Sequence, residues 1–199
     1  MMKKLLITGF DPFGGESINP SWEAVKRLDD EIDGFRLTKL EVPTIFEKGA
    51  KIILDAAEKL RPDVIFMIGQ AGGRSGITPE VIGINLREAR IADNEGNMPS
   101  AVPVVENAPA AYFSTVHVRE IVNELKNAGI PSSLSYSAGA FVCNDCLYTV
   151  LNAFDKTDTK VGFIHVPFLP EQAKNGAPSL PLEEIVRGLT LAVKAEAGA

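Results

Sequence analysis

The feature that most constrains the fold is the alternation of strand-like apolar runs with helix-like segments along the whole chain. Six runs of strand character occur: Lys4–Thr8, Phe35–Val42, Val64–Ile68, Val81–Leu86, Ser133–Ser137 and Val161–Val166. Parallel strands need long crossover connections, which are usually helices. Strands separated by helical segments therefore predict a largely parallel sheet that is covered on both faces.

Five helices are expected between and after these strands. Asn19 and Pro20 are typical of a cap and a first helical residue, and the apolar spacing extends this first helix to Ile32. The other helices are expected at Phe46–Leu60, Ala111–Asn127, from Cys143 onward, and at Leu182–Ala195. No linker, repeat or low-complexity segment divides residues 1–199. We therefore expect one domain of the α/β class, a three-layer α/β/α sandwich with a largely parallel mixed sheet.

Composition and charge narrow the range of partners. Charged residues make up 23% of the chain and the net charge is −6, with no basic stripe, which argues against nucleic-acid and membrane-surface partners. No apolar stretch approaches the ~18 residues of a membrane span. The first apolar run stops at Ile7, which predicts a strand and not a signal peptide. Two closely spaced cysteines do not suit a secreted disulfide scaffold, so we expect a cytoplasmic protein.

Cys143 lies where a small-residue turn leads into a predicted helix. Backbone N–H groups at a helix N-terminus favour a thiolate and can hold an oxyanion beside the sulfur. Free cysteines are also among the most buried residues, so a catalytic thiol and a core residue both remain open.

A catalytic thiol needs a base, and the chain contains only two histidines. His165 closes a buried strand, where polar chemistry is favoured, whereas His117 is expected in the middle of a helix as a structural residue. A third group should orient the imidazole. Glu80, between Pro79 and an apolar run, is the candidate, although the pattern alone slightly favours a solvent-facing carboxylate.

Two glycine-rich loops follow predicted strands. The loop 9–15 carries Phe10 and Phe13, which suggests either a pocket for a flat ring or packing onto the sheet edge. Neither loop has the spacing of a nucleotide-binding motif. The turn Gly69–Arg74 could hold an anion, which leaves a phosphate- or nucleoside-binding transferase as an alternative. Because ligands bind at the carboxyl ends of parallel strands, we expect these loops and His165 to converge.

Cys143 and Cys146 have the Cys-x-x-Cys spacing of a redox dithiol. Asp145 between them opposes thiolate formation at Cys146, and the two histidines are far from each other in sequence, so redox and metal functions are minor alternatives.

Together these motifs resemble one family, pyroglutamyl peptidase type I. The matching segments are Thr8–Gly15 with Asn19–Ser21, Gly69–Arg74 with Ile77–Glu80, Ala89–Gly96, Ala138–Asn144 and Gly162–Pro167. They follow the family order over nearly the whole chain. The resemblance implies an α/β/α fold and a cysteine peptidase that removes an N-terminal pyroglutamyl residue from peptides through an acyl-enzyme, without a metal or cofactor.

The resemblance also implies roles for individual residues. Cys143 would be the nucleophile, His165 the base and Glu80 the orienting carboxylate. The substrate-binding residues would be Phe10 and Phe13 around the pyrrolidone ring, Phe141 and Val142 along the pocket, Gln70 as a polar contact and Arg90 at the oxyanion. It implies a homo-oligomer, commonly a homotetramer. Pyroglutamate is a neutral lactam without a free ammonium group, and an apolar, aromatic pocket suits it.

Overall fold

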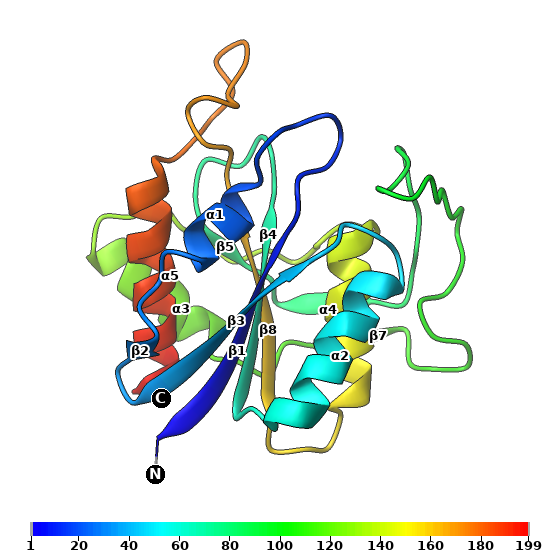
Figure 1. The fold of residues 1–199 in the computed structure, drawn as a ribbon, viewed down its shortest axis with the longest axis horizontal. Helices are drawn as coiled ribbons and strands as arrows, with labels where there is room; N and C mark the ends of the chain where they lie inside the picture. The colour runs from blue at the N-terminus through cyan, green and yellow to red at the C-terminus, as the bar shows by residue number, and fades with distance from the viewer. Residues whose placement is uncertain (1, 199) are drawn as a thin grey trace.

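A computed structural model of the chain describes residues 2–198 and has a twisted central sheet (Figure 1). The six strands have the order β2-β3-β1-β4-β8-β5. Their bounds are Lys3–Phe10 for β1, Glu31–Ile32 for β2, Phe35–Val42 for β3, Val64–Gln70 for β4, Thr78–Pro79 for β5 and Lys160–Val166 for β8. The four inner strands pair in parallel, and the short edge strands β2 and β5 pair antiparallel. The predicted largely parallel mixed sheet is confirmed.

Side-chain alternation along the inner strands builds a separate core on each face of the sheet. In β1, Leu5 and Ile7 enter one core and Leu6 enters the other. Three helices cover the first core: α1 (Pro20–Val25), α3 (Val118–Asn127) and α5 (Leu182–Ala197). Two helices cover the second core: α2 (Lys48–Leu60) and α4 (Val142–Ala153). Figure 1 shows these two helical layers on either side of the sheet, so the predicted sandwich is confirmed.

The helix expected over Ala111–Asn127 was wrong in its first part. Ala111–Phe113 form strand β7, which pairs antiparallel with β6 (Ile82–Ile84) in a separate two-stranded sheet. The next residues also bond to other segments, because the Thr115 N–H donates to the Val161 carbonyl. Tertiary pairing therefore overrides the local helical pattern. The helix begins at Val118, so His117 lies at its N-cap and not in its middle.

Three other boundaries differ from expectation. The strand expected over Val81–Leu86 is shorter, and Ser133–Ser137 forms no strand, only an isolated bridge at Ser135. Helix α1 stops at Val25, and Ile32 belongs to β2 because the chain turns back there into β3. The start of α1 is as predicted, since the Asn19 side chain accepts a hydrogen bond from the Ser21 N–H at 3.1 Å.

Strands β1, β4 and β8 are adjacent and parallel, so their carboxyl ends meet at one edge of the sheet. Phe13 in the loop after β1, Gln70 at the end of β4 and His165 near the end of β8 therefore lie together, as expected. Within residues 2–198, no helix has both the length and the apolar character required to cross a membrane.

Candidate active site

A buried carboxylate–imidazole pair lies at the carboxyl end of β8. Strand β5 pairs with β8 so that Thr78 lies opposite His165, and Glu80 follows directly. The Nδ1 atom of His165 is 2.7 Å from the Oε1 atom of Glu80. Glu80 is fully buried and His165 is 3% exposed. Glu80 therefore faces the protein interior, contrary to the slight preference of its sequence pattern. The contact leaves Nε2 as the ring nitrogen free to exchange a proton.

Arg74 is the second partner of the buried carboxylate. Its Nη1 atom donates to Glu80 Oε1 at 2.7 Å. Burial opposes ionisation of Glu80, but the hydrogen bond with His165 and the nearby charges hold its pKa below the usual value. Burial also disfavours the charged form of the imidazole, so it lowers the pKa of His165 despite the carboxylate. The pair therefore combines an ionised carboxylate with a neutral imidazole near neutral pH.

Cys143 is the second residue of α4, and its side chain lines the same cavity of about 960 Å³ as His165. The first backbone bond inside this helix runs from the Asp145 N–H to the Phe141 carbonyl, at 3.1 Å. The N–H groups of Val142, Cys143 and Asn144 therefore lack partners within the helix and are available beside the sulfur.

The thiol is protonated in the resting site. Burial and the negative charge of Glu80 raise the pKa of Cys143 to about 12, which outweighs the helix N-terminus that was expected to favour a thiolate. The lowered pKa of His165 also favours a protonated thiol, because it makes the imidazole a weaker base. A neutral thiol beside a neutral imidazole suits a mechanism in which the imidazole removes the proton as the sulfur attacks.

Two buried polar side chains fix the first turn of α4. The Asn144 Oδ1 atom accepts from the Ile84 N–H at 2.9 Å, and its Nδ2 atom donates to the Ile84 carbonyl at 2.8 Å. The Asp145 carboxylate accepts from the Glu47 N–H at 2.8 Å and from the Arg87 guanidinium. Bonds to β6 and to the start of α2 thus hold the helix that carries Cys143.

The cavity brings together most of the residues expected to bind substrate. Phe13, Gln70, Arg90 and Phe141 line it with Cys143 and His165. The other lining residues are Ala71, Gly72, Arg74, Glu88, Ile91, Ser137, Ala138, Gly139 and Ala140. Sequence reasoning did not single out the small-residue wall 137–140 or Glu88 as cavity residues.

Aromatic rings form the apolar side of this cavity. The ring centroids of Phe13 and Phe141 are 6.3 Å apart, and Phe46 packs edge-on against Phe141 at 5.1 Å. On the polar side, the Gln172 side-chain amide donates to the Gln70 Oε1 atom at 3.1 Å, which orients the Gln70 side chain. A flat, uncharged ring with polar groups at its edge fits such surroundings.

Phe10 and Val142 do not line the cavity. Phe10 is the last residue of β1, is 2% exposed and packs against Phe163 with ring centroids 6.2 Å apart. Val142 is fully buried in the same core. The sequence left two possibilities for the aromatic loop, a ring pocket or packing onto the sheet. Phe10 packs onto the sheet, whereas Phe13 lines the cavity.

The loop that carries Phe13 is tied to the segment that follows Arg90. The Asn94 side-chain amide donates to Asp11 Oδ1 at 3.1 Å and to the Pro12 carbonyl at 2.9 Å. The same Asp11 oxygen accepts from the Thr44 N–H at 2.7 Å. Two walls of the cavity are therefore held at a fixed separation.

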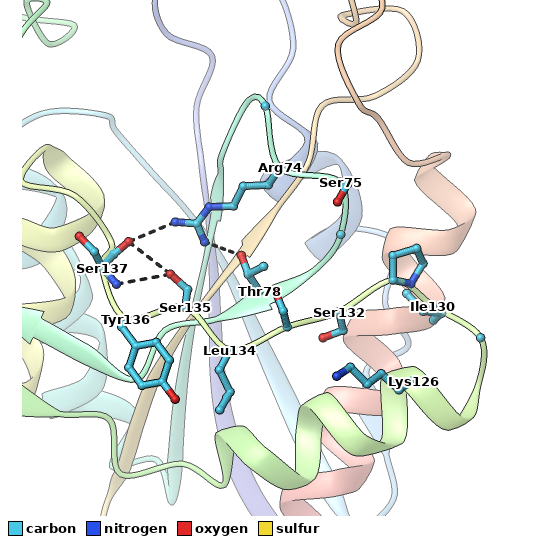
Figure 2. Close-up of a pocket in the computed structure, with 15 residues that line it drawn as sticks. Arg74, Ser75, Thr78, Lys126, Ile130, Ser132, Leu134, Ser135, Tyr136 and Ser137 are labelled. Atoms are coloured by element: carbon cyan, nitrogen blue, oxygen red, sulfur yellow. Dashed lines mark hydrogen bonds between the residues drawn. The ribbon is translucent and has the colours of Figure 1, made fainter.

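Arg74 lies between this cavity and a second one of about 980 Å³. Figure 2 shows the second cavity, with the Arg74 side chain reaching toward Thr78 and the Ser137 carbonyl. The sequence predicted for Arg74 only a place in a turn that could bind an anion. Its donors instead engage Glu80, Thr78 and Ser137, so the turn offers little to a phosphate. The signal that could have revealed its role was Glu80, because a buried carboxylate requires a charged partner.

The second cysteine belongs to the core. Cys146 is fully buried among apolar residues, and both cysteines are free thiols. Burial raises the pKa of Cys146 well above its usual value. Among the residues from 2 to 198, no group of three or more His, Cys, Asp and Glu side chains is arranged to hold a metal ion.

The chain is similar in sequence and in fold to known peptidases. The sequence model of the family described as Pyroglutamyl peptidase matches residues 3–198. A pyrrolidone-carboxylate peptidase of Bacillus thuringiensis (strain Al Hakam) is 52% identical, over 97% of this chain and 92% of that protein. The pyroglutamyl peptidase I structure from Bacillus amyloliquefaciens has a TM-score of 0.97 and 46% identity, covering 100% of this chain and 97% of that one. The pyrrolidone carboxyl peptidase of Thermococcus litoralis has a TM-score of 0.95 and 36% identity, covering 99% and 94%. The chain therefore belongs to the pyroglutamyl peptidase family of hydrolases.

Proposed function

We propose that the protein hydrolyses the amide bond after an N-terminal pyroglutamyl residue through a thioester formed on Cys143. Membership of the family supports the removal of pyroglutamate. The observation that carries the cysteine mechanism is the shared cavity, in which a thiol at a helix start lies with an imidazole whose far nitrogen contacts Glu80. This arrangement supplies a nucleophile, a base and an orienting carboxylate.

In the first half-reaction, the Cys143 sulfur forms a bond to the carbonyl carbon while its proton passes to Nε2 of His165. The free N–H groups at the start of α4 stabilise the oxyanion, and Arg90 at the exposed rim adds positive charge there. The C–N bond then breaks, and the imidazolium gives its proton to the leaving amine. A thioester between pyroglutamate and Cys143 remains.

In the second half-reaction, water replaces the amine. His165 takes a proton from the water as its oxygen attacks the thioester carbon. The C–S bond breaks, the proton returns to the sulfur, and free pyroglutamate leaves. Glu80, whose pKa is held below its usual value, stays ionised throughout and stabilises the imidazolium of each step.

The pocket is proposed to recognise the lactam by shape and by lack of charge. Phe13 and Phe141 would contact the ring faces and Gln70 a polar edge, while Phe10 and Val142 support these groups from the core. A free α-ammonium would have to be desolvated among these apolar groups, which is costly.

A pair of fluorogenic amides tests the proposal. Pyroglutamyl aminomethylcoumarin should be hydrolysed by the reduced protein, whereas the prolyl analogue, which has the same ring size but a charged ring nitrogen, should not. Mass spectrometry of protein quenched in acid during turnover should show the added mass of a pyroglutamyl group, and replacement of Cys143 by alanine should remove it. Equal turnover of the two amides, or none of the first, would refute the proposal.

We also propose that the protein is cytoplasmic and assembles as a homo-oligomer, a tetramer by family resemblance. Free thiols support a reducing compartment. Ile91, Met98 and Val102 expose large apolar surfaces on the long segment between β6 and β7, which supports an interface there. Light scattering after gel filtration should give a mass near four times 21.4 kDa, and a monomer mass would contradict the assembly.

A further inference from the structure

We propose that Arg74 is a positioning residue of this reaction, because it holds Glu80 behind His165 and also fixes the backbone segment that leads to Cys143. The inference rests on the proposed thiol mechanism. Arg74 is thus a fourth residue, which holds the proposed nucleophile, base and carboxylate in place.

The contacts of one guanidinium group join three segments of the chain. Nη1 donates to Glu80 Oε1 at 2.7 Å and to the Thr78 hydroxyl, and Nη2 donates to the Ser137 carbonyl at 3.1 Å. Figure 2 shows the bonds to Thr78 and Ser137. Arg74 itself comes from the turn after β4. The planar fork of arginine makes these bonds simultaneously, which a lysine ammonium on a flexible stem does less well.

The first function of this contact is to keep the carboxylate ionised and oriented. Glu80 is fully buried, and its Oε2 atom has no hydrogen-bond partner among residues 2–198. Within those residues, Arg74 and His165 are the basic side chains within ion-pair distance of Glu80. Since the resting imidazole is neutral, Arg74 supplies the permanent positive charge.

The second function is to hold the wall of the cavity. Ser137 begins the stretch 137–141, which lines the active-site cavity and ends at the N-cap of α4. Gly139 in this stretch has a φ of 78°, a conformation that glycine adopts readily. The backbone here forms no strand, so a side-chain bond to the Ser137 carbonyl restrains a segment without regular structure.

Other titratable groups face Arg74 and Glu80 from the surrounding elements. Cys143 approaches from α4, and Glu88 and Arg90 line the cavity from the segment after β6. Lys126 of α3 lines the second cavity together with Arg74, and among the described residues it forms no salt bridge with Glu80. Lys126 therefore serves as a matched control, since it is a cation beside the same cavity that does not contact Glu80.

The test compares Arg74→Gln, Arg74→Lys and Lys126→Gln on the pyroglutamyl coumarin amide across pH. Arg74→Gln should lower kcat about 100-fold or more with KM changed less than threefold, on the scale of ~1 Å misplacements in active sites. Arg74→Lys should keep part of the activity, and Lys126→Gln should match the unmodified protein. Because the Arg74 charge lowers the pKa of His165, Arg74→Gln should also move the acid limb of kcat/KM to higher pH.

A purely structural role would lower the melting temperature and leave the acid limb in place for the folded protein. The inference is overturned if Arg74→Gln keeps its kcat, or if it loses activity with an unmoved pH profile while circular dichroism shows it folded. An unmodified protein without turnover would instead refute the proposed function, so the two failures are distinguishable.

Discussion

Replacing Gly69 by alanine should disturb the active site through one added methyl group. Gly69 lies near the end of β4, opposite His165 in the sheet register. A Cβ atom there would lie 2.6 and 2.8 Å from two ring carbons of Phe163 and 3.0 Å from the Cys143 sulfur. Ordinary carbon–carbon contacts are about 3.5–4.0 Å, so the ring would have to move by roughly 1 Å.

The Phe163 ring cannot move away without a cost in stability. Phe163 is fully buried between Phe10 and His165, with ring centroids 6.2 and 4.7 Å away. Overpacking of this kind costs about 1–3 kcal/mol, which lowers the melting temperature by roughly 2–12 °C at about 2–4 °C per kcal/mol for a chain of this size. Displacement of the sulfur or imidazole by a comparable distance should reduce kcat/KM about 100-fold.

Thermal unfolding and kinetics on the coumarin amide at 25 °C measure the two effects. Gly162→Ala is the matched control on β8, because its Cβ would meet Val116 at 2.2 Å, away from the cavity residues. That variant should lose stability but keep kcat/KM while folded. The reasoning is refuted if Gly69→Ala retains both its melting temperature and its activity, or if Gly162→Ala loses as much activity as Gly69→Ala.

Three further outcomes follow from the site. Cys143→Ser should abolish nearly all hydrolysis, whereas Cys146→Ala should keep kcat/KM within about threefold and cost about 1 kcal/mol in urea unfolding, because that thiol only fills the core; equal activity loss would indicate a dithiol. Phe13→Ala should raise KM about tenfold, the equivalent of ~1.4 kcal/mol, and an unchanged KM would count against the aromatic pocket. The folded-state pKa values of Glu80 and His165 are both lowered, so the unfolded chain binds more protons as the pH falls. Stability measured by urea unfolding should therefore decrease below about pH 6.5 and continue to fall through the carboxylate range, and a flat profile from pH 7 to 4 would contradict these shifts.

Local sequence patterns were sufficient for the inner strands and for the start of α1. Continuous apolar runs such as Val64–Ile68 identify strands that are buried on both faces, and Asn19 with Pro20 marks a helix start through chemistry confined to two residues. They failed for Ala111–Phe113 and for Ser133–Ser137, where the backbone bonds of each segment depend on partners far along the chain. Such pairing cannot be recovered from periodicity.

The sequence alone determined the layered α/β fold, the glycine-rich loops after the strands and the thiol at a helix start. Each of these depends on residues that are neighbours in the chain, and the family resemblance named the chemistry. Only the tertiary structure decided that Glu80 is buried against His165, that Arg74 is its counter-ion and that Phe10 belongs to the core. It also decided that Cys143 rests as a protonated thiol, because burial outweighs the helix N-terminus. These properties follow from desolvation and from charges brought together across the sheet, and no local pattern contains them.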